Sequence, residues 1–414
     1  MIPDGTRVPK PPQPIPERIL PSHLAPQSLS VVVFGPGHGE AIVVVLPDGT
    51  VGVVDGCREP TVLDPVREFL EELSREPGRQ GQPLRLGFVC MTHPHEDHYR
   101  GLGRLLEAFR GRVERVWRTP DVGDRYVRSW LQFLKHTQKD RRLTPEPDDV
   151  EGLARIMAEM RLATQEHGAK FLQLQHRMQL MEGVMEGHPI RILGCGPASR
   201  DLDTAQITLL GVLKGLKRGR KPGHFDPNAA SGALLIEWGQ ARVLLAGDLL
   251  CRKGSFQGWE EVCDDIPGPV QVIKAAHHAS LGAHHDALWT RLQPTLAIVT
   301  PFLHAKGRQP PRPKQITRLS RDSVVAITSE PRWRRASTHP RPVFGTSRMR
   351  RGADPQVTTG GFANNAMSQV PTGGEADARN AVAVSLDATG KLLRFVLAGR
   401  ADVYEPSAGT YGTP

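Results

Sequence analysis

Four side chains that can bind metal ions lie close together in the sequence: His93, His95, Asp97 and His98. They follow a short apolar run at 86–91, which predicts a buried strand, and precede a segment with apolar residues at helical spacing. In an extended segment His93 and His95 point the same way, whereas Asp97 and His98 fall where the chain turns into the helix. Imidazole and carboxylate are ligands for zinc, manganese and iron. The spacing therefore predicts two adjacent metal ions, with one histidine pair on the first and Asp97 and His98 on the second. The alternative is a solvated, histidine-rich loop.

Three other apolar runs also end in polar groups: Asp55, Gly247-Asp248 and His277-His278. An acidic residue at the end of a buried strand is costly unless it is paired or hydrogen-bonded. Asp248 therefore stands where a bridging carboxylate would be presented. We expect Asp55 to orient a ligand histidine, with a solvated loop carboxylate as the alternative.

The elements that must position these groups alternate between strand and helix patterns. A meander of strands at 31–34, 41–46 and 51–54 is followed by a helix at 61–73, the motif strand and the motif helix. This order favours an α/β layered fold. Further strands are predicted at 113–117, 171–175, 190–193, 233–238, 242–246, 270–276, 296–300 and 324–328, and helices at 129–136, 150–165, from 203 and at 316–319.

The pattern divides the chain into four segments. Residues 1–29 are rich in proline and predict a flexible arm, and residues 30–330 form the α/β domain with a helical insertion at about 120–170. Residues 331–380 are rich in arginine, glycine and proline and predict a basic flexible linker. Residues 381–414 hold a hairpin and a tail. A hairpin alone is marginal, so it should dock on the main sheet or on a partner protein.

The composition favours a polyanionic partner. The chain of 414 residues has 53 Lys and Arg against 44 Asp and Glu, a formal net charge of +9. Lys214, Lys217, Arg218, Arg220 and Lys221 form a basic run, which is either a solvated surface or a strip that contacts phosphates.

The other compositional signals point to a reducing compartment. The 5 cysteines are widely spaced without a C-x-x-C pair, which argues against a disulfide framework. We see neither a signal peptide nor an apolar run of the roughly 18 residues that a membrane helix needs. The expectation is a soluble, cytoplasmic protein with no membrane association.

Together these motifs resemble those of the metallo-β-lactamase fold superfamily, and within it most closely the hydrolase domain of ComEC-type competence proteins. The resemblance covers roughly residues 30–330. It implies a metallo-β-lactamase-like αββα sandwich, here with a helical insertion and a C-terminal hairpin. The matching motifs are H-x-H-x-D-H, the Gly-rich turn before Glu40, Asp55-Gly56, Asn228 with Ser231, Gly247-Asp248, and Lys274-Ala275-Ala276-His277-His278-Ala279-Ser280.

The resemblance also implies a ligand set. His93 and His95 would bind the first metal, Asp97 and His98 the second, and Asp248 would bridge them. His277 would complete the second site, with His278 beside it. Zinc is the expected ion, one or two per chain, with manganese as the alternative.

Two departures from the family pattern concern this ligand set. Many members have another histidine near 194–197, where this chain has only Cys195, a chemically suitable ligand but more typical of a buried structural cysteine. Ala279 replaces the usual glycine. His284, His285 and His304 read as surface residues.

The implied activity is hydrolysis by metal-bound hydroxide. Asp97 would orient or deprotonate the water, and Lys274 would favour an anionic substrate, so both are candidate catalytic residues. We expect a phosphodiesterase or nuclease acting on DNA or a nucleotide. The alternatives are a hydrolase of a small ester, thioester or lactam, and a regulatory protein that binds metal without turnover.

Overall fold

The computed structural model describes residues 8, 14–37, 39–57, 64–76, 83–119, 147–218, 226–252, 257–302, 310–331 and 379–404. The predicted helix at 129–136, most of the basic linker, His304 and the end of the basic run lie outside the described residues.

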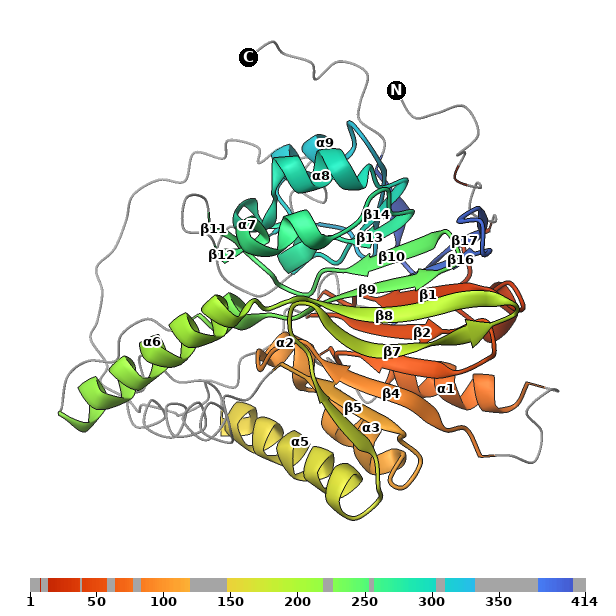
Figure 1. Ribbon diagram of the computed structural model, residues 1–414. Coiled ribbons are helices and arrows are strands. Elements are labelled where there is room, and N and C mark those ends of the chain that lie inside the picture. Colours follow the sequence, from red (N-terminus) through yellow and green to blue (C-terminus); the bar gives the residue numbers. More distant parts are fainter. Residues whose placement is uncertain are drawn as a thin grey trace, which may run out of the picture.

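Two mixed sheets of eight strands each lie face to face (Figure 1). The first has the order β17-β16-β1-β2-β3-β4-β5-β6 and the second the order β18-β15-β14-β13-β10-β9-β8-β7. The strands of the first sheet are β1 (Leu29–Phe34), β2 (Ala41–Val45), β3 (Val51–Val54), β4 (Leu86–Met91), β5 (Arg115–Arg118), β6 (Lys170–Gln173), β16 (Ala381–Leu386) and β17 (Leu392–Ala398). Those of the second are β7 (Met178–Met185), β8 (His188–Gly196), β9 (Ala233–Trp238), β10 (Ala241–Leu245), β13 (Val272–Lys274), β14 (Leu296–Val299), β15 (Val324–Ile327) and β18 (Asp402–Val403). A short ribbon, β11 (Cys251–Arg252) with β12 (Gln257–Gly258), stands apart from both.

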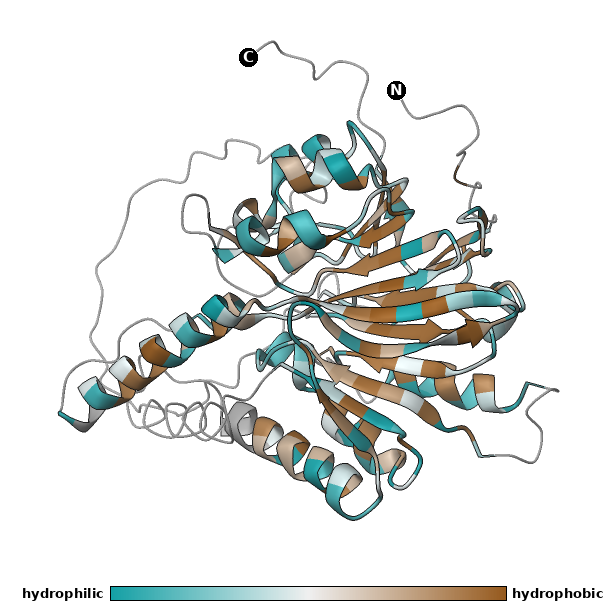
Figure 2. Ribbon diagram, in the orientation of Figure 1, coloured by the Kyte–Doolittle hydropathy of each residue, from teal (hydrophilic) through white to brown (hydrophobic). Residues whose placement is uncertain are grey.

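Helices cover the outer face of each sheet. The helices are α1 (Pro65–Ser74), α2 (Glu96–Tyr99), α3 (Leu102–Ala108), α5 (Pro147–Gln165), α6 (Ser199–Lys217), α7 (Trp259–Val262), α8 (Asp286–Leu292) and α9 (Pro313–Leu319). Apolar residues of α1, α3 and α5 share a core with the first sheet, and those of α7, α8 and α9 share one with the second. A third core fills the space between the sheets, where Figure 2 shows mostly apolar strands. The predicted αββα sandwich is therefore confirmed.

Strand residues alternate between these cores because successive side chains point to opposite faces. In β1, Val31 and Val33 enter the core between the sheets, while Val32 and Phe34 face the helices. Both faces are covered, which explains why the sequence shows near-continuous apolar runs there rather than apolar–polar alternation.

The C-terminal hairpin joins the first sheet at its edge. All six residues of β16 pair antiparallel with β1, and β18 then pairs with β15 of the second sheet. The hairpin thus docks on the main sheet, which was one of the two predicted possibilities. A protein partner for it remains a prediction.

Some elements differ from the sequence expectations. Residues before Ser30, which were assigned to a flexible arm, include Ile19 and Leu24, and both are buried in the core under the first sheet. Strand β7 was not predicted, because half of its residues are exposed and its glycine weakens the strand pattern.

Parallel pairing brings the site to one edge of the sandwich. In the first sheet β3 and β4 run parallel, and in the second β10, β13 and β14 do the same. The carboxyl ends of neighbouring parallel strands lie together at one edge of a sheet. The polar groups that follow these strands are therefore close in space although far apart in sequence.

Candidate metal centre

Four acidic and histidine side chains form a buried cluster, called here the second site: Asp97, His98, Asp248 and His278. His98 Nε2 lies 3.2 Å from Asp248 Oδ1, and His278 Nε2 lies 3.0 Å from Asp97 Oδ2. Each of these side chains is at most 4% exposed. Two imidazoles and two carboxylates held this closely form a donor set that suits a divalent metal.

A neighbouring cluster, called the first site, consists of His93, His95 and Asp248. His93 Nε2 lies 4.0 Å from Asp248 Oδ2, so the two oxygens of this carboxylate face different clusters. The His95 side chain is 36% exposed, which opens the first site to solvent. The predicted bridging position of Asp248 agrees with this geometry.

Two glycines allow the backbone to pass close to its neighbours around the candidate site. Gly247 has φ +49°, and a Cβ there would lie 2.3 Å from the Gly232 carbonyl oxygen. Gly39 has φ +96°, and a Cβ there would lie 1.9 Å from the Asp97 carbonyl oxygen. Both positions therefore need glycine, which lets Asp248 and the motif loop reach the site.

Asp55 orients the ligand histidines, as predicted. Its carboxylate accepts hydrogen bonds from His98 Nδ1 at 2.8 Å and from the Thr92 hydroxyl at 2.7 Å. Because the Thr92 proton is donated to Asp55, its oxygen accepts from His93 Nδ1, 3.0 Å away. Both imidazoles then carry a proton on Nδ1 and turn Nε2 toward Asp248.

His278 is held in the same way. Its Nδ1 donates to the Thr300 carbonyl oxygen at 2.8 Å, which leaves Nε2 for the cluster. The sequence analysis had given this place in the second site to His277. Three successive left-handed residues reverse the chain here, with φ of +46°, +54° and +56° at His277, His278 and Ala279, so the buried imidazole is the second of the pair.

Lys274 is not in the cleft. Its side chain is fully buried, and its ammonium group pairs with Glu40 and donates to the Gly247 carbonyl oxygen at 3.2 Å. Glu40 in turn accepts from the Thr300 hydroxyl at 2.7 Å. The prediction that Lys274 acts on an anionic substrate is therefore corrected: it supports the site from behind. No local pattern links it to Glu40, which comes far earlier in the chain.

The charges of the site are strongly coupled. Burial opposes a charge on His98, yet the carboxylates of Asp248, Asp97 and Asp55 raise its pKa well above the usual value. Burial also opposes a charge on His95, but Asp97 outweighs it and raises the pKa to about 9. His95 and His98 in turn hold the pKa of Asp97 well below its usual range, although burial would raise it. The Asp97 carboxylate is thus ionised at neutral pH and attracts positive charge.

Unpartnered atoms show that the donor set fits a metal. Within the described residues, the buried atoms without a hydrogen-bond partner include His93 Nε2, His98 Nε2 and both carboxylate oxygens of Asp248, while His95 Nδ1 lies 2.6 Å from Asp97 Oδ1. Buried polar atoms are normally satisfied, so a group of them facing one another calls for a ligand. Ligand atoms around a tetrahedral zinc are about 3.4 Å apart, by the usual zinc–ligand lengths, and the distances given above are close to this.

The other candidate ligands lie outside both clusters. Burial raises the pKa of the Cys195 thiol to about 12, and the residue packs in the core of the second sheet, as a structural cysteine would. His284 contacts Asp286, and His285 caps α8 by accepting from the Leu288 N–H. Ser231 was named only as a motif residue, but its hydroxyl accepts from the Asp248 N–H at 2.8 Å and lies 3.2 Å from His93 Nδ1.

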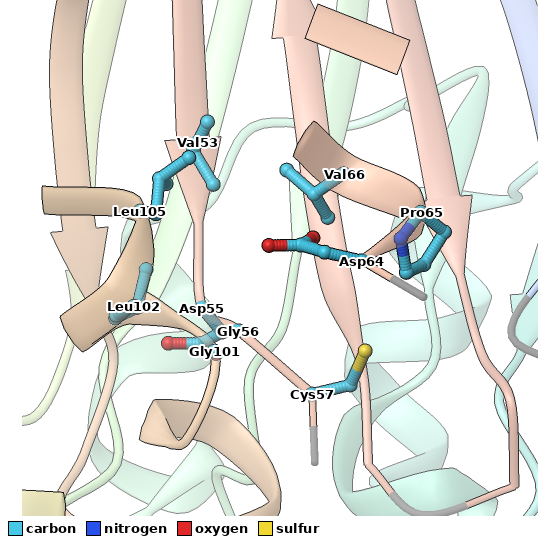
Figure 3. Close-up of a pocket in the computed structure, with 10 residues that line it drawn as sticks. All are labelled: Val53, Asp55, Gly56, Cys57, Asp64, Pro65, Val66, Gly101, Leu102 and Leu105. Atoms are coloured by element: carbon cyan, nitrogen blue, oxygen red, sulfur yellow. The ribbon is translucent and has the colours of Figure 1, made fainter. Parts of the chain in front are cut away.

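A small pocket lies on the helix side of Asp55, lined by Val53, Cys57, Leu102 and Leu105 among others (Figure 3). Its space is about 10 Å³, which is about the volume that one water needs. This pocket cannot hold a substrate. The exposed side of the first site, at His95, is where a substrate can approach.

The family profile of the metallo-beta-lactamase superfamily matches residues 35–292, more than half of the chain. The chain therefore belongs to the metallo-beta-lactamase superfamily, whose domain contains both candidate metal sites. No curated protein sequence matches it.

Solved structures resemble this chain only distantly. One is the metallo-beta-lactamase fold protein YhfI from Bacillus subtilis, at 12% identity and a TM-score of 0.36, covering 72% of this chain and 96% of that one. Another is Tm1679, a metal-dependent hydrolase of the beta-lactamase superfamily, at 12% identity and 0.35, covering 72% and 95%. A mutant of CmlA beta-hydroxylase matches at 15% identity and 0.33, covering 67% of this chain, which spans only 46% of that protein.

Among the described residues, no helix is both long and apolar enough to cross a membrane.

Proposed function

We propose that this protein is a metal-dependent hydrolase that cleaves a phosphodiester of DNA or of a nucleotide. The observation that carries the proposal is the pair of candidate metal sites that share Asp248, in which His93 Nε2, His98 Nε2 and both Asp248 oxygens are buried without a hydrogen-bond partner. Zinc fits the mixed imidazole and carboxylate donors, and manganese is the alternative. When bound, such ions activate water and stabilise the charge that develops on the attacked group.

Residues of the chain would accept the proton from water and hold the ligand histidines in place. Asp97 Oδ1 is buried and lies 2.6 Å from His95 Nδ1 at the open first site. Since its pKa is held well below the usual range, this carboxylate is ionised and can accept a proton from water. Asp55 and Thr300 hold His98 and His278 in place.

An anionic substrate is supported by the basic charge of the chain. Lys214 and Arg218 are exposed at the end of α6, and the net charge of +9 acts in the same direction. The resemblance to the ComEC-type hydrolase domain favours a phosphodiester over an ester or lactam.

The test is hydrolysis of bis(4-nitrophenyl) phosphate and of linear DNA by purified protein with zinc or manganese. Asp248→Ala removes the carboxylate that serves both sites and should lower turnover by at least about 100-fold, since the metals contribute several kcal/mol to the barrier. Asp264→Ala is the matched control, because that side chain is 92% exposed.

The outcomes separate the alternatives. Turnover that survives in Asp264→Ala and is lost in Asp248→Ala supports the proposal. Equal residual activity in both would come from a contaminant and reject it. Bound metal without cleavage of either substrate would favour a small ester, thioester or lactam as substrate, or a regulatory protein without turnover.

A further inference from the structure

His277 is in neither cluster. Like the candidate ligand histidines, however, it turns Nε2 toward Asp248 and makes a hydrogen bond through Nδ1. Its Nε2 lies 3.7 Å from Asp248 Oδ2. That oxygen faces the first site, since His93 Nε2 lies 4.0 Å from it, whereas His98 approaches Oδ1. His277 thus approaches Asp248 from the side of the first site.

The hydrogen bonds of His277 favour the tautomer that has its lone pair on Nε2. The Asn228 amide nitrogen, a donor, lies 3.2 Å from His277 Nε2, so Nε2 accepts. In a neutral imidazole the proton is then on Nδ1, which donates to the Ser280 hydroxyl at 3.0 Å. This is the tautomer in which Nε2 can bind a metal, and it matches His93, His98 and His278.

The backbone at this point is strained in a way that separates the two histidines. His277, His278 and Ala279 all have left-handed φ values, which are unfavourable for residues other than glycine. Strain of this kind is concentrated at functional sites. It directs His278 into the buried second site and leaves the His277 side chain 27% exposed beside the first site.

We propose that His277 is the third imidazole ligand of the first metal site and takes the place of the family histidine that this chain lacks near Cys195. The inference rests on the metal-dependent function proposed above. The adjacent histidines then serve different ions: His278 binds at the second site and His277 at the first. Asp248 Oδ2, His93, His95 and His277 would give the first site four protein donors, and a zinc ion that expands to five-coordinate would still accept water. Zinc at His277 Nε2 would replace the hydrogen bond that the Asn228 amide donates to this atom.

The experiment measures zinc, not turnover. The full chain is stripped with a chelator, reloaded with zinc alone, and the zinc content and affinities are determined by mass spectrometry and chelator competition. The variants are His277→Asn, His95→Asn and their double variant, with His188→Asn as control, because His188 is an exposed residue at the start of β8. Asparagine is chosen because it tolerates left-handed φ, and circular dichroism verifies the fold of each variant.

The expected result is that His277→Asn weakens zinc binding at the first site by at least tenfold, as His95→Asn does, and that the double variant still retains the second zinc. His277→Asn combined with His278→Asn should lose both ions. A change of less than tenfold in His277→Asn, or loss of both ions from the His95 and His277 double variant, would overturn the inference. Absence of hydrolysis by the wild type would reject the proposed function and leave the zinc result unaffected.

Discussion

The two metal sites share a carboxylate but differ in how they are held. Every side chain of the second site is at most 4% exposed, whereas His95 in the first site is 36% exposed. The histidines of the second site donate to a carboxylate and to a backbone carbonyl, Asp55 and Thr300. His93 of the first site is held by the hydroxyls of Thr92 and Ser231.

This difference implies a division of roles. Rigid, buried ligands with strong hydrogen bonds behind them are preorganised, so the second site should bind its ion tightly. The first site keeps an exposed ligand and an open side, which is typical of a site where substrate and water exchange. The comparison predicts that substitutions behind the second site affect stability and metal affinity more than equivalent ones behind the first.

The largest effect is expected for Lys274→Met. Lys274 is fully buried and paired with Glu40, whose carboxylate lies 3.9 Å from the Nδ1 atoms of both His98 and His278. Removal of the ammonium leaves a buried carboxylate without its partner, which costs about 3–5 kcal/mol. The free energy of unfolding of the metal-free protein, measured by urea denaturation, should fall by this amount.

Lys314→Met is the control for Lys274→Met, since Lys314 is exposed on α9 and should change stability by less than about 0.5 kcal/mol. A loss below about 1 kcal/mol in Lys274→Met would show that the buried pair does not support the second site. The double variant Lys274→Met with Glu40→Gln should recover part of the loss, because no uncompensated charge then remains buried.

A smaller effect is expected for Asp55→Asn. Asp55 fixes the proton of His98 on Nδ1, and partners of this kind change metal affinity by about 10–100-fold when removed. Chelator competition should show this loss at the second site. Thr92→Val, which removes the hydroxyl between Asp55 and His93, should weaken the first site less, because the Ser231 hydroxyl remains 3.2 Å from His93 Nδ1.

Equal losses at both sites in Asp55→Asn and Thr92→Val would contradict the comparison. Asp48→Asn provides the baseline, because Asp48 lies in an exposed turn, where it accepts hydrogen bonds from the Thr50 N–H and hydroxyl.

Local patterns in the sequence were enough to predict which polar side chains follow the strand ends and gather in the candidate metal centre. H-x-H-x-D-H, Gly247-Asp248 and His277-His278 each follow an apolar run, and apolar runs are what the sandwich buries. The role of Asp55 followed from the cost of burying a carboxylate without a partner.

What could not be predicted depends on contacts between distant parts of the chain. Lys274 pairs with Glu40 across the two sheets, and a lysine in an apolar strand gives no sign of this. The assignment of His278 rather than His277 to the second site depends on three left-handed residues, which a histidine pair followed by alanine does not suggest. Strand β7 was missed because it is an exposed edge strand.

The smallest effect, and the most direct comparison of the two sites, is the dependence of zinc binding on pH. In the metal-free protein Asp97 raises the pKa of His95 to about 9, so at pH 7.5 this imidazole holds a proton that zinc must displace. Below pH 9 the first-site affinity for zinc should therefore rise by about tenfold per pH unit for each proton displaced.

The stability of the metal-free fold should respond to pH in the opposite sense. A raised histidine pKa adds stability that is complete below the unfolded pKa of about 6.5 and is lost as the pH rises through 9. Calorimetric titration in buffers of different ionisation enthalpy counts the protons released, and His95→Asn should release about one fewer than the wild type. The same proton count in both proteins would mean that His95 is not protonated beside Asp97. Zinc binding at the exposed first site would then displace no proton from this imidazole.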